Sequence, residues 1–332
     1  MLHLPHVVTI CEVGPRDGFQ MERDFIPTEH KVRIIDALSE TGVKEIEVTS
    51  FVHPRAIPQL RDAEDVMARI KRVPGVVYRA LVPNVRGAQR ALDAGVDRLQ
   101  VVVSLSDSHS LSNVNRTTDQ ALDEVEEVVR RAQQAGTPVA AAIATALGCP
   151  FEGFLPAERL IGVCRRLVDC GIERIDLADT VGMAHPALVY DRVSRLRDRF
   201  PGVDLGLHLH DTRRMAMANI VVALQAGITR FDGAVGGLGG CPYAPGATGN
   251  IATEDMVHML EAMGIATGVH LDRLLAVARE VEKVVGHPLE SFVLRSGKSS
   301  DLIKQRVTGQ KKVGEPATSQ GNDGPFPRRW TG

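Results

Sequence analysis

A short aliphatic run, a polar or glycine-containing turn and an amphipathic stretch recur in that order eight times in this sequence, at intervals of roughly 25 to 40 residues. The aliphatic runs are typical of buried strands, and the amphipathic stretches of helices with one apolar face. The eight runs span residues 7–13, 45–51, 76–82, 98–105, 139–147, 174–177, 205–210 and 230–235. The chain is therefore predicted to be an α/β protein built from eight consecutive strand–helix units.

Eight such units favour a closed (β/α)₈ TIM barrel over a doubly wound sheet. A doubly wound sheet usually has fewer strands and carries a Gly-x-Gly-x-x-Gly turn after the first one, and no such turn follows the first run here. The 332 residues are enough for one barrel with length to spare, and the 44% hydrophobic content excludes a disordered chain over most of the sequence.

The surplus length lies at the C-terminus. Helical patterns cover about 253–263 and about 271–285, and a tail rich in Gly, Ser, Pro and Lys starts at Ser296. We predict a barrel domain with its C-terminal helices over residues 1–287 and an extension over 288–332. The tail holds seven Lys or Arg and three Asp or Glu. It is either a loosely ordered, solvated extension or a basic flap over the site that Trp330 tethers.

The overall charge and the cysteines narrow the class of protein. The 39 basic and 41 acidic residues nearly cancel, which argues against nucleic acid or an anionic membrane as a partner. The five cysteines are odd in number and form no Cys-x-x-Cys pair, and the sequence shows neither a secretory segment nor an apolar run long enough to span a bilayer. We therefore expect a cytoplasmic protein.

Polar residues gather where the predicted strands end. Active sites of TIM barrels lie at the carboxyl ends of the strands, so these residues are expected to share one rim. They include carboxylates, imidazoles, a guanidinium and a carboxamide, namely Glu12, Arg16, Asp17, Glu47, Thr49, Ser50, Asp176, Asp179, His208, His210 and Asn250. The sequence therefore predicts an active site at this end of the barrel.

The spacing of His208 and His210 indicates a metal site. Alternate residues of a strand point to the same face, so both imidazoles can reach the barrel mouth together. Two histidines packed in the core would show the same pattern. Asp17, at the end of the first strand, adds an anionic oxygen and favours the metal interpretation. Mixed oxygen and nitrogen ligands favour Mg²⁺ or Mn²⁺, and Zn²⁺ remains the less favoured alternative.

Cys241 follows a glycine-rich segment and precedes Pro242. Glycines let the backbone approach a ligand closely, and such a loop can carry a thiol over an active site. The alternative is that Cys241 is only a small residue in a tight turn.

Several motifs together resemble 3-hydroxy-3-methylglutaryl-CoA (HMG-CoA) lyases, over roughly residues 7 to 285. The motifs are residues 12–18 (EVGPRDG), 50–52 (SFV), 147–150 (LGCP), 208–212 (HLHDT) and 237–250 (GLGGCPYAPGATGN). This family belongs to a group of metal-dependent barrels that also contains acyl-CoA condensing synthases, and the Cys241 loop points to the cleaving branch. The resemblance implies divalent-metal-dependent cleavage of HMG-CoA, or a close analogue, to acetyl-CoA and acetoacetate, and a homodimer.

The resemblance also implies roles for individual residues. Asp17, His208, His210 and Asn250 would hold the divalent metal. Arg16 would stabilise the enolate of the departing thioester, Cys241 and His208 would carry protons, and Glu47 and Asp179 would support the polar network around the reacting hydroxyl. Substrate contacts are expected from Arg16, Gln20, Thr212 and Arg213.

Some positions depart from the leucine-degrading lyases and leave the acyl group open. The departures are Met21, Asp176, Arg213, Arg214 and the stretch 104–112. Three alternatives therefore remain beside HMG-CoA cleavage: a lyase for citramalyl-CoA or another 3-hydroxyacyl-CoA, a condensing synthase of the same barrel group, and a barrel that binds an acyl-CoA without catalysis. The last would need a broken set of metal ligands, which the sequence does not have.

Overall fold

Eight parallel strands close into a barrel in a computed structural model that describes residues 4–240 and 249–301. Each strand pairs with the next along the chain, and β8 pairs with β1. The strands are β1 (Thr9–Glu12), β2 (Glu45–Ser50), β3 (Val77–Leu81), β4 (Arg98–Ser104), β5 (Val139–Ala144), β6 (Arg174–Asp179), β7 (Asp204–Leu209) and β8 (Arg230–Gly233). The predicted (β/α)₈ barrel is confirmed, with a strand inside or overlapping each of the eight apolar runs.

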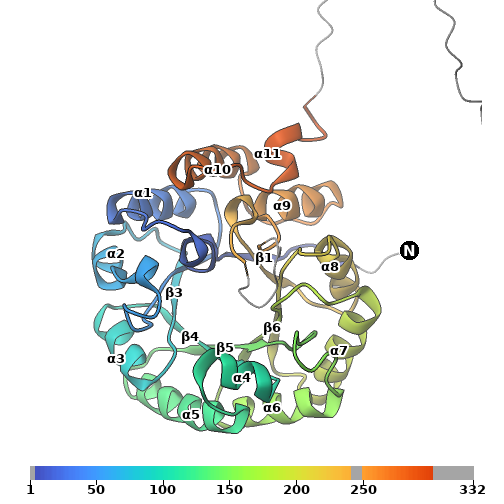
Figure 1. Cartoon of the computed structure of the whole chain (residues 1–332). Coiled ribbons are helices and arrows are strands. Elements are labelled where there is room, and N and C mark those ends of the chain that lie inside the picture. Colours follow the sequence, from blue (N-terminus) through green and yellow to red (C-terminus); the bar gives the residue numbers. More distant parts are fainter. Residues whose placement is uncertain (1–3, 241–248, 302–332) are drawn as a thin grey trace, which may run out of the picture. The chain divides into compact units, whose positions relative to one another are not determined.

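Helices surround the strands and form the outer ring of the barrel (Figure 1). Those between the strands are α1 (Thr28–Ser39), α2 (Ala63–Arg69), α3 (Val85–Asp93), α4 (Asp107–Val114), α5 (Thr118–Gln134), α6 (Ala157–Asp169), α7 (Pro186–Arg199) and α8 (Ala216–Gln225). The sequence of α5 explains both its start and its orientation. Thr117 and Gln120 form a reciprocal capping box, and the apolar side chains spaced three and four apart are buried against the barrel.

Among the described residues, three α-helices follow β8 and lie side by side at one part of the ring (Figure 1). They are α9 (Thr253–Ala262), α10 (Leu271–Val285) and α11 (Phe292–Ser296). The first two match the predicted helices, whereas α11 was not predicted. Asp255 of α9 explains why α11 forms, because its carboxylate accepts hydrogen bonds from the Ser291 hydroxyl and from the backbone amides of Phe292 and Val293, all at 2.8 Å.

Contacts within the chain separate residues 1–298 from residues 299–332. The α11 helix therefore belongs to the same compact unit as the barrel. Most of the basic tail, including Trp330, lies outside the described residues. Among the described helices, none combines the length and the apolar composition needed to cross a membrane.

The interior of the barrel is unusually polar at the level of the strand centres. Side chains of TIM-barrel interiors are usually bulky and aliphatic. Here, a buried arginine lies among buried carboxylates and a second arginine, and the set comprises Glu45, Glu47, Arg79, Gln100, Asp176, Arg230 and Asp232. These charges are paired across the barrel, which is what allows them to be buried. The strand pattern had not revealed this network.

Candidate active site

The turn after β1 carries the first group of site residues. Residues Gly14–Gly18 form a π-helical turn, a geometry that recurs at functional sites. In this turn the Arg16 guanidinium pairs with both Asp17 and Glu47. Asp17 also accepts hydrogen bonds from the Gln20 amide at 2.8 Å and from the Asn250 amide at 2.7 Å. Three predicted site residues, Arg16, Gln20 and Asn250, therefore contact the buried Asp17 carboxylate.

The two predicted histidine ligands lie beside that carboxylate. The Nε2 atoms of His208 and His210 are 3.3 Å apart, and they lie 3.7 and 3.6 Å from Asp17 Oδ2. Asp17, His208 and His210 each offer one possible ligand atom, and these three atoms all lie within 4.8 Å of one another. A candidate metal centre thus exists at the barrel mouth, as the His-x-His spacing predicted.

Asn250 lies beside this cluster and offers a fourth candidate ligand, the oxygen of its carboxamide. Its side chain is 3% exposed, and its Oδ1 atom has no hydrogen-bond partner among the described residues, although its Nδ2 atom donates to Asp17 and to the Leu238 carbonyl. A buried carbonyl oxygen without a partner is costly unless a cation or water satisfies it. The donor set therefore fits a divalent cation held by oxygen and imidazole nitrogen.

Glycines let Asn250 approach the mouth. At Gly239 the backbone has φ of +119°, and a Cβ atom there would lie 2.6 Å from Asn250 Nδ2. No other residue type fits both the conformation and the contact. Cys241, two residues later, lies outside the described residues, so its predicted place over the site is not tested.

The charges of the cluster favour one ionisation pattern. Burial disfavours ionised Asp17, but the Arg16 charge and the two histidines outweigh this effect and hold the pKa of the carboxyl well below its usual range. Burial also opposes protonation of both histidines. For His208 the hydrogen bond to Asp232 prevails and raises the pKa, whereas the pKa of His210 is lowered. Asp17 is therefore anionic at neutral pH.

Asp179 lies at the end of β6, next to β7 in the barrel. Its two oxygens accept hydrogen bonds from the backbone amides of Met183 at 2.7 Å and Ala184 at 3.0 Å, so the following turn holds it. Burial raises the pKa of Asp179 to about 6 despite these donors. Its carboxyl thus titrates close to neutral pH, where a proton acceptor is most effective.

The residues predicted to contact substrate lie in two places, the Asp17 cluster and the turn after β6. Gln20 joins the Asp17 cluster directly. Arg213 donates to the backbone carbonyls of Val181 and Gly182, each at 2.9 Å, and Thr212 packs against Gly182, where an added Cβ atom would be 2.7 Å from the Thr212 Cβ. Thr212 and Arg213 therefore lie against the turn after β6.

Comparison of the sequence with known proteins shows the family to which the chain belongs. The profile of the HMGL-like family matches residues 7–281. This chain belongs to the HMGL-like family. It is 49% identical over 296 residues to hydroxymethylglutaryl-CoA lyase YngG of Bacillus subtilis, covering 89% of this chain and 99% of that protein. It is also 42% identical to a cytoplasmic 3-hydroxy-3-methylglutaryl-CoA lyase of Rattus norvegicus, covering 88% and 85% of the two chains. The resemblance identified from the motifs is confirmed.

Solved structures of the family agree with the fold. The HMG-CoA lyase of Bacillus subtilis superposes with a TM-score of 0.86, over 88% of this chain and 98% of that one. An HMG-CoA lyase from Acinetobacter baumannii, solved in complex with coenzyme A and 3-methylmalate, is 40% identical, with a TM-score of 0.87 over 92% and 99% of the two chains.

The departures from the family motifs have structural partners in this HMGL-like chain. Asp176 is buried inside the barrel, where it pairs with Arg230. Arg214 pairs with Asp211 and Glu290. Met21 lies beside the glycine loop, 3.4 Å from where a Cβ atom of Gly240 would be. Met21 therefore lies next to Gly240, and Arg214 lines a pocket with Gly237 and Asn250.

Sequence reasoning missed Asp232, which contacts the candidate metal centre. Its Oδ2 atom lies 3.2 Å from His208 Nδ1, so Asp232 binds the ring nitrogen that faces away from Asp17. Metal-binding histidines commonly donate this second N–H to a carboxylate. The signal was present in the sequence, because Asp232 alternates with Arg230 on β8 and therefore points into the barrel.

Two buried glutamates tie the first and last loops of the site together. Glu12 accepts hydrogen bonds from the amides of Gly14 at 2.7 Å and Val235 at 2.8 Å and from the Thr253 hydroxyl at 2.6 Å. Glu254 accepts from the Gly236 amide through both oxygens, at 2.9 and 3.0 Å. Burial raises the pKa of Glu12 to about 7 and that of Glu254 to about 8. These carboxyls anchor the backbone on both sides of the mouth.

The raised pKa of Glu254 predicts a specific pH dependence of stability. In the unfolded chain Glu254 ionises near pH 4.5, whereas in the folded chain it keeps its proton until about pH 8. Its contribution to stability is therefore complete below pH 4.5 and is lost as the pH rises through 8. The neutral variant Glu254→Gln lacks this loss, so the difference in free energy of unfolding between variant and wild type should rise with pH, by up to about 5 kcal/mol.

Thermal or urea unfolding at pH 5, 7 and 9 measures this difference. Glu261→Gln, a change on the exposed side of the same helix, is the matched control and should show no such trend. A constant difference between Glu254→Gln and wild type across this range would contradict the prediction.

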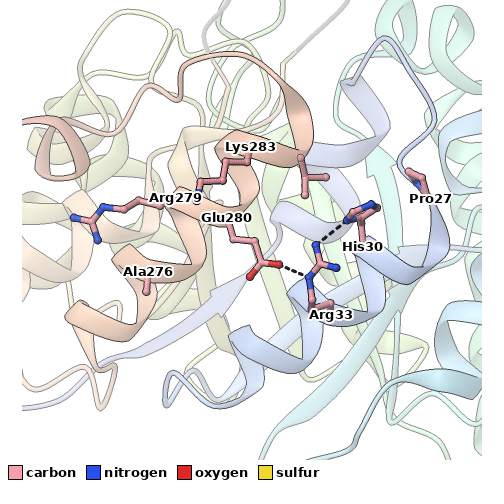
Figure 2. Close-up of a pocket in the computed structure, with 8 residues that line it drawn as sticks. Pro27, His30, Arg33, Ala276, Arg279, Glu280 and Lys283 are labelled. Carbon is pink, nitrogen blue, oxygen red and sulfur yellow. Dashed lines mark hydrogen bonds and ion pairs between the residues drawn. The ribbon is translucent and has the colours of Figure 1, made fainter.

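A pocket of about 770 Å³ lies outside the barrel, between α1 and α10 (Figure 2). Two of its charged side chains pair with one another, since Arg33 binds Glu280, and Arg33 also lies 2.8 Å from the Nδ1 atom of His30. None of the predicted site residues lines it. The candidate active site is therefore the cluster at the barrel mouth.

Proposed function

We propose that this protein is a divalent-metal-dependent carbon–carbon lyase that cleaves HMG-CoA to acetyl-CoA and acetoacetate. Membership of the HMGL-like family and the HMG-CoA lyases among its relatives support this proposal. The observation that carries it is the position of Arg16, which pairs with Asp17 at the edge of the Asp17–His208–His210 cluster. A cation and a guanidinium side by side suit a reaction that needs charge stabilisation at two neighbouring oxygens.

The residues proposed to hold the metal are Asp17, His208, His210 and Asn250. Two imidazoles, a carboxylate and a carboxamide oxygen support Mg²⁺ or Mn²⁺, with Zn²⁺ less favoured. When bound, the metal supplies a Lewis acid that polarises the hydroxyl oxygen of the substrate. Asp17 is anionic and Asn250 Oδ1 lacks a partner among the described residues, so both are ready to accept a cation.

Cleavage requires that the substrate hydroxyl lose its proton while the adjacent C–C bond breaks. The electron pair of that bond moves onto the thioester carbonyl and forms an enolate, which then takes a proton at carbon to give acetyl-CoA. Arg16 is the proposed partner of the enolate oxygen, because its guanidinium stays charged and presents fixed donors. Its pairs with Asp17 and Glu47 fix its direction before substrate binds.

Proton transfer is assigned to His208 and Cys241. Because Asp232 binds His208 Nδ1, Nε2 is the ring nitrogen that faces the mouth, and it serves either as a metal ligand or as a proton carrier. Cys241 is proposed to protonate the enolate carbon. Asp179 and Glu47 support the network, and the pKa of Asp179 near 6 suits exchange of a proton with the reacting hydroxyl.

Gln20, Thr212 and Arg213, together with Arg16, are the proposed contacts of the acyl-CoA. The Acinetobacter baumannii lyase with bound coenzyme A supports this substrate class. We further propose a homodimer in the cytoplasm, and the four free cysteines among the described residues support a reducing compartment. Size-exclusion chromatography with light scattering tests the dimer, whose measured mass should be twice the 35.9 kDa of one chain.

The substrate is tested with a panel of CoA thioesters, each assayed for acetyl-CoA release with Mg²⁺ or Mn²⁺ and again with a chelator. HMG-CoA should be cleaved only in the presence of metal, and chelation should remove the activity completely and reversibly. Preferential turnover of a citramalyl thioester would replace the proposed acyl group. Consumption of acetyl-CoA with a 2-keto acid would instead indicate a condensing synthase, and metal-independent cleavage would contradict the proposal.

A further inference from the structure

Arg79, on β3, lies at the centre of the polar barrel interior. Its side chain is 1% exposed and extends from the strand into the interior among four buried carboxylates. Two of these contacts are close: Arg79 Nε is 2.7 Å from Glu47 Oε2, and Arg79 Nη2 donates to Asp232 Oδ2 at 2.8 Å. The other two, to Glu45 and Asp176, are longer, at 3.5 and 3.6 Å.

The two distant carboxylates have other arginine partners. Glu45 pairs with Arg98 at 3.0 Å and with Arg174 at 2.6 Å, and Asp176 pairs with Arg230. Compensation of these charges therefore does not depend on Arg79. Its close contacts are with Glu47 and Asp232, which both reach the candidate active site.

On one side, Glu47 lies between Arg79 and Arg16 and pairs with both. The Glu47 carboxylate is fully buried; its Oε2 atom forms a close ion pair with Arg79 Nε that is not aligned as a hydrogen bond, and its Oε1 atom accepts from Arg16. Because Arg79 pairs with one oxygen from below, the other oxygen is left to meet the guanidinium at the mouth. The orientation of Arg16 thus depends on a carboxylate that Arg79 holds.

On the other side, Asp232 lies between Arg79 and His208 and contacts both. Asp232 Oδ2 accepts from Arg79 and also lies 3.2 Å from His208 Nδ1. Arg79 belongs to β3 and Asp232 to β8, 153 residues apart in sequence, so the link crosses the barrel. It places the His208 N–H on Nδ1 and leaves Nε2 facing Asp17 and His210.

We propose that Arg79 is a positioning residue that aligns both halves of the active site, Arg16 through Glu47 and His208 through Asp232. This inference rests on the proposed function, because it takes the His208 cluster as the metal centre and Arg16 as the group that meets the enolate. One planar guanidinium pairs with Glu47 through Nε and donates to Asp232 through Nη2, so it acts on both orientations at once. Lysine provides a single point charge and cannot hold both carboxylates in the same geometry.

The test compares Arg79→Lys with Arg174→Lys. Both changes keep the charge of a barrel arginine paired with a buried carboxylate, but Arg174 binds Glu45 and has no contact with Glu47 or Asp232. Two quantities are measured on each purified protein. One is the Mn²⁺ dissociation constant of the metal-free protein, from the electron paramagnetic resonance signal of free Mn²⁺, and the other is the kcat and KM for HMG-CoA.

For Arg79→Lys we expect Mn²⁺ binding to weaken by about tenfold or more and kcat to fall by about 10- to 100-fold, the range typical of lost outer partners of a metal ligand, with KM little changed. Arg174→Lys should stay within about twofold of wild type in both quantities. Equal behaviour of the two variants would overturn the inference. It would leave the proposed function intact if the wild-type protein binds Mn²⁺ and cleaves HMG-CoA.

Asp232→Asn keeps the inference testable if Arg79→Lys does not fold. This variant preserves size but removes the charge that Arg79 and His208 share, so Mn²⁺ affinity should fall by about tenfold or more. Unchanged affinity in a folded Asp232→Asn protein would overturn the inference. A wild-type protein that neither binds Mn²⁺ nor cleaves HMG-CoA would overturn the proposed function and this inference with it.

Discussion

Asp17→Asn is expected to lower kcat for HMG-CoA cleavage by about 10³-fold or more and to weaken Mn²⁺ binding strongly. A bound metal contributes several kcal/mol of charge stabilisation, and each 1.36 kcal/mol corresponds to a factor of ten in rate. Asn has the size of Asp but lacks the anionic charge at the centre of the cluster. It also places an amide where Arg16, Gln20 and Asn250 donate hydrogen bonds. Steady-state kinetics and a Mn²⁺ titration measure both effects.

Asp24→Asn is the control for this change, because Asp24 is exposed and lies outside the candidate cluster. It should retain wild-type rate and metal affinity. If Asp17→Asn kept full activity in a metal-loaded assay, the assignment of Asp17 to the metal would be wrong.

Arg16→Met is expected to reduce kcat by about 10² to 10³-fold with a small change in KM, as when one donor to a developing oxyanion is removed. Arg16→Lys should recover part of this loss, because the charge remains but the fixed fork of donors does not. The Mn²⁺ affinity of both variants should stay closer to wild type than that of Asp17→Asn, since Arg16 is not a proposed ligand. The split between kcat and metal affinity separates the two roles.

Arg159→Lys is the matched control for Arg16. Arg159 also lies near the barrel rim, where it donates to the Leu105 carbonyl and pairs with Asp107, both at 2.7 Å. Its replacement should leave kcat within about twofold of wild type, as expected for a change away from the site. An equal loss in Arg16→Lys and Arg159→Lys would show that the rim tolerates neither change and would contradict a specific role for Arg16.

Local sequence patterns predicted much of the fold and of the candidate site. Strand and helix periodicity depend on the next few residues, so the eight strands and the helices α9 and α10 could be found without tertiary information. Asp17, His208, His210 and Asn250 could be assigned to one rim because the carboxyl ends of parallel strands in a closed barrel meet there. The helix α11 was missed because its five residues form too short a pattern, and Asp255, 36 residues away from Ser291, caps it.

The parts that could not be predicted depend on pairs distant in sequence. Arg79 occupies an ordinary strand run, and nothing in its neighbourhood indicates that Asp232 of β8 and Glu47 of β2 meet it inside the barrel. The hydrogen bond from His208 Nδ1 to Asp232 also joins residues of different strands, since strand alternation gives the direction of a side chain but not its partner. The attachment of the Val235 amide to Glu12 depends equally on barrel closure.

The eightfold strand–helix order, the rim at which the site lies and the family could all be read from the chain, because they follow from local periodicity and from motifs contiguous in sequence. The charges that share the barrel interior, the His208 nitrogen that faces the mouth and the link through one buried arginine became visible only in the folded barrel. The physical reason is closure of the barrel, which brings β3 and β8 within reach of one another and lets charges pair that no stretch of sequence places together.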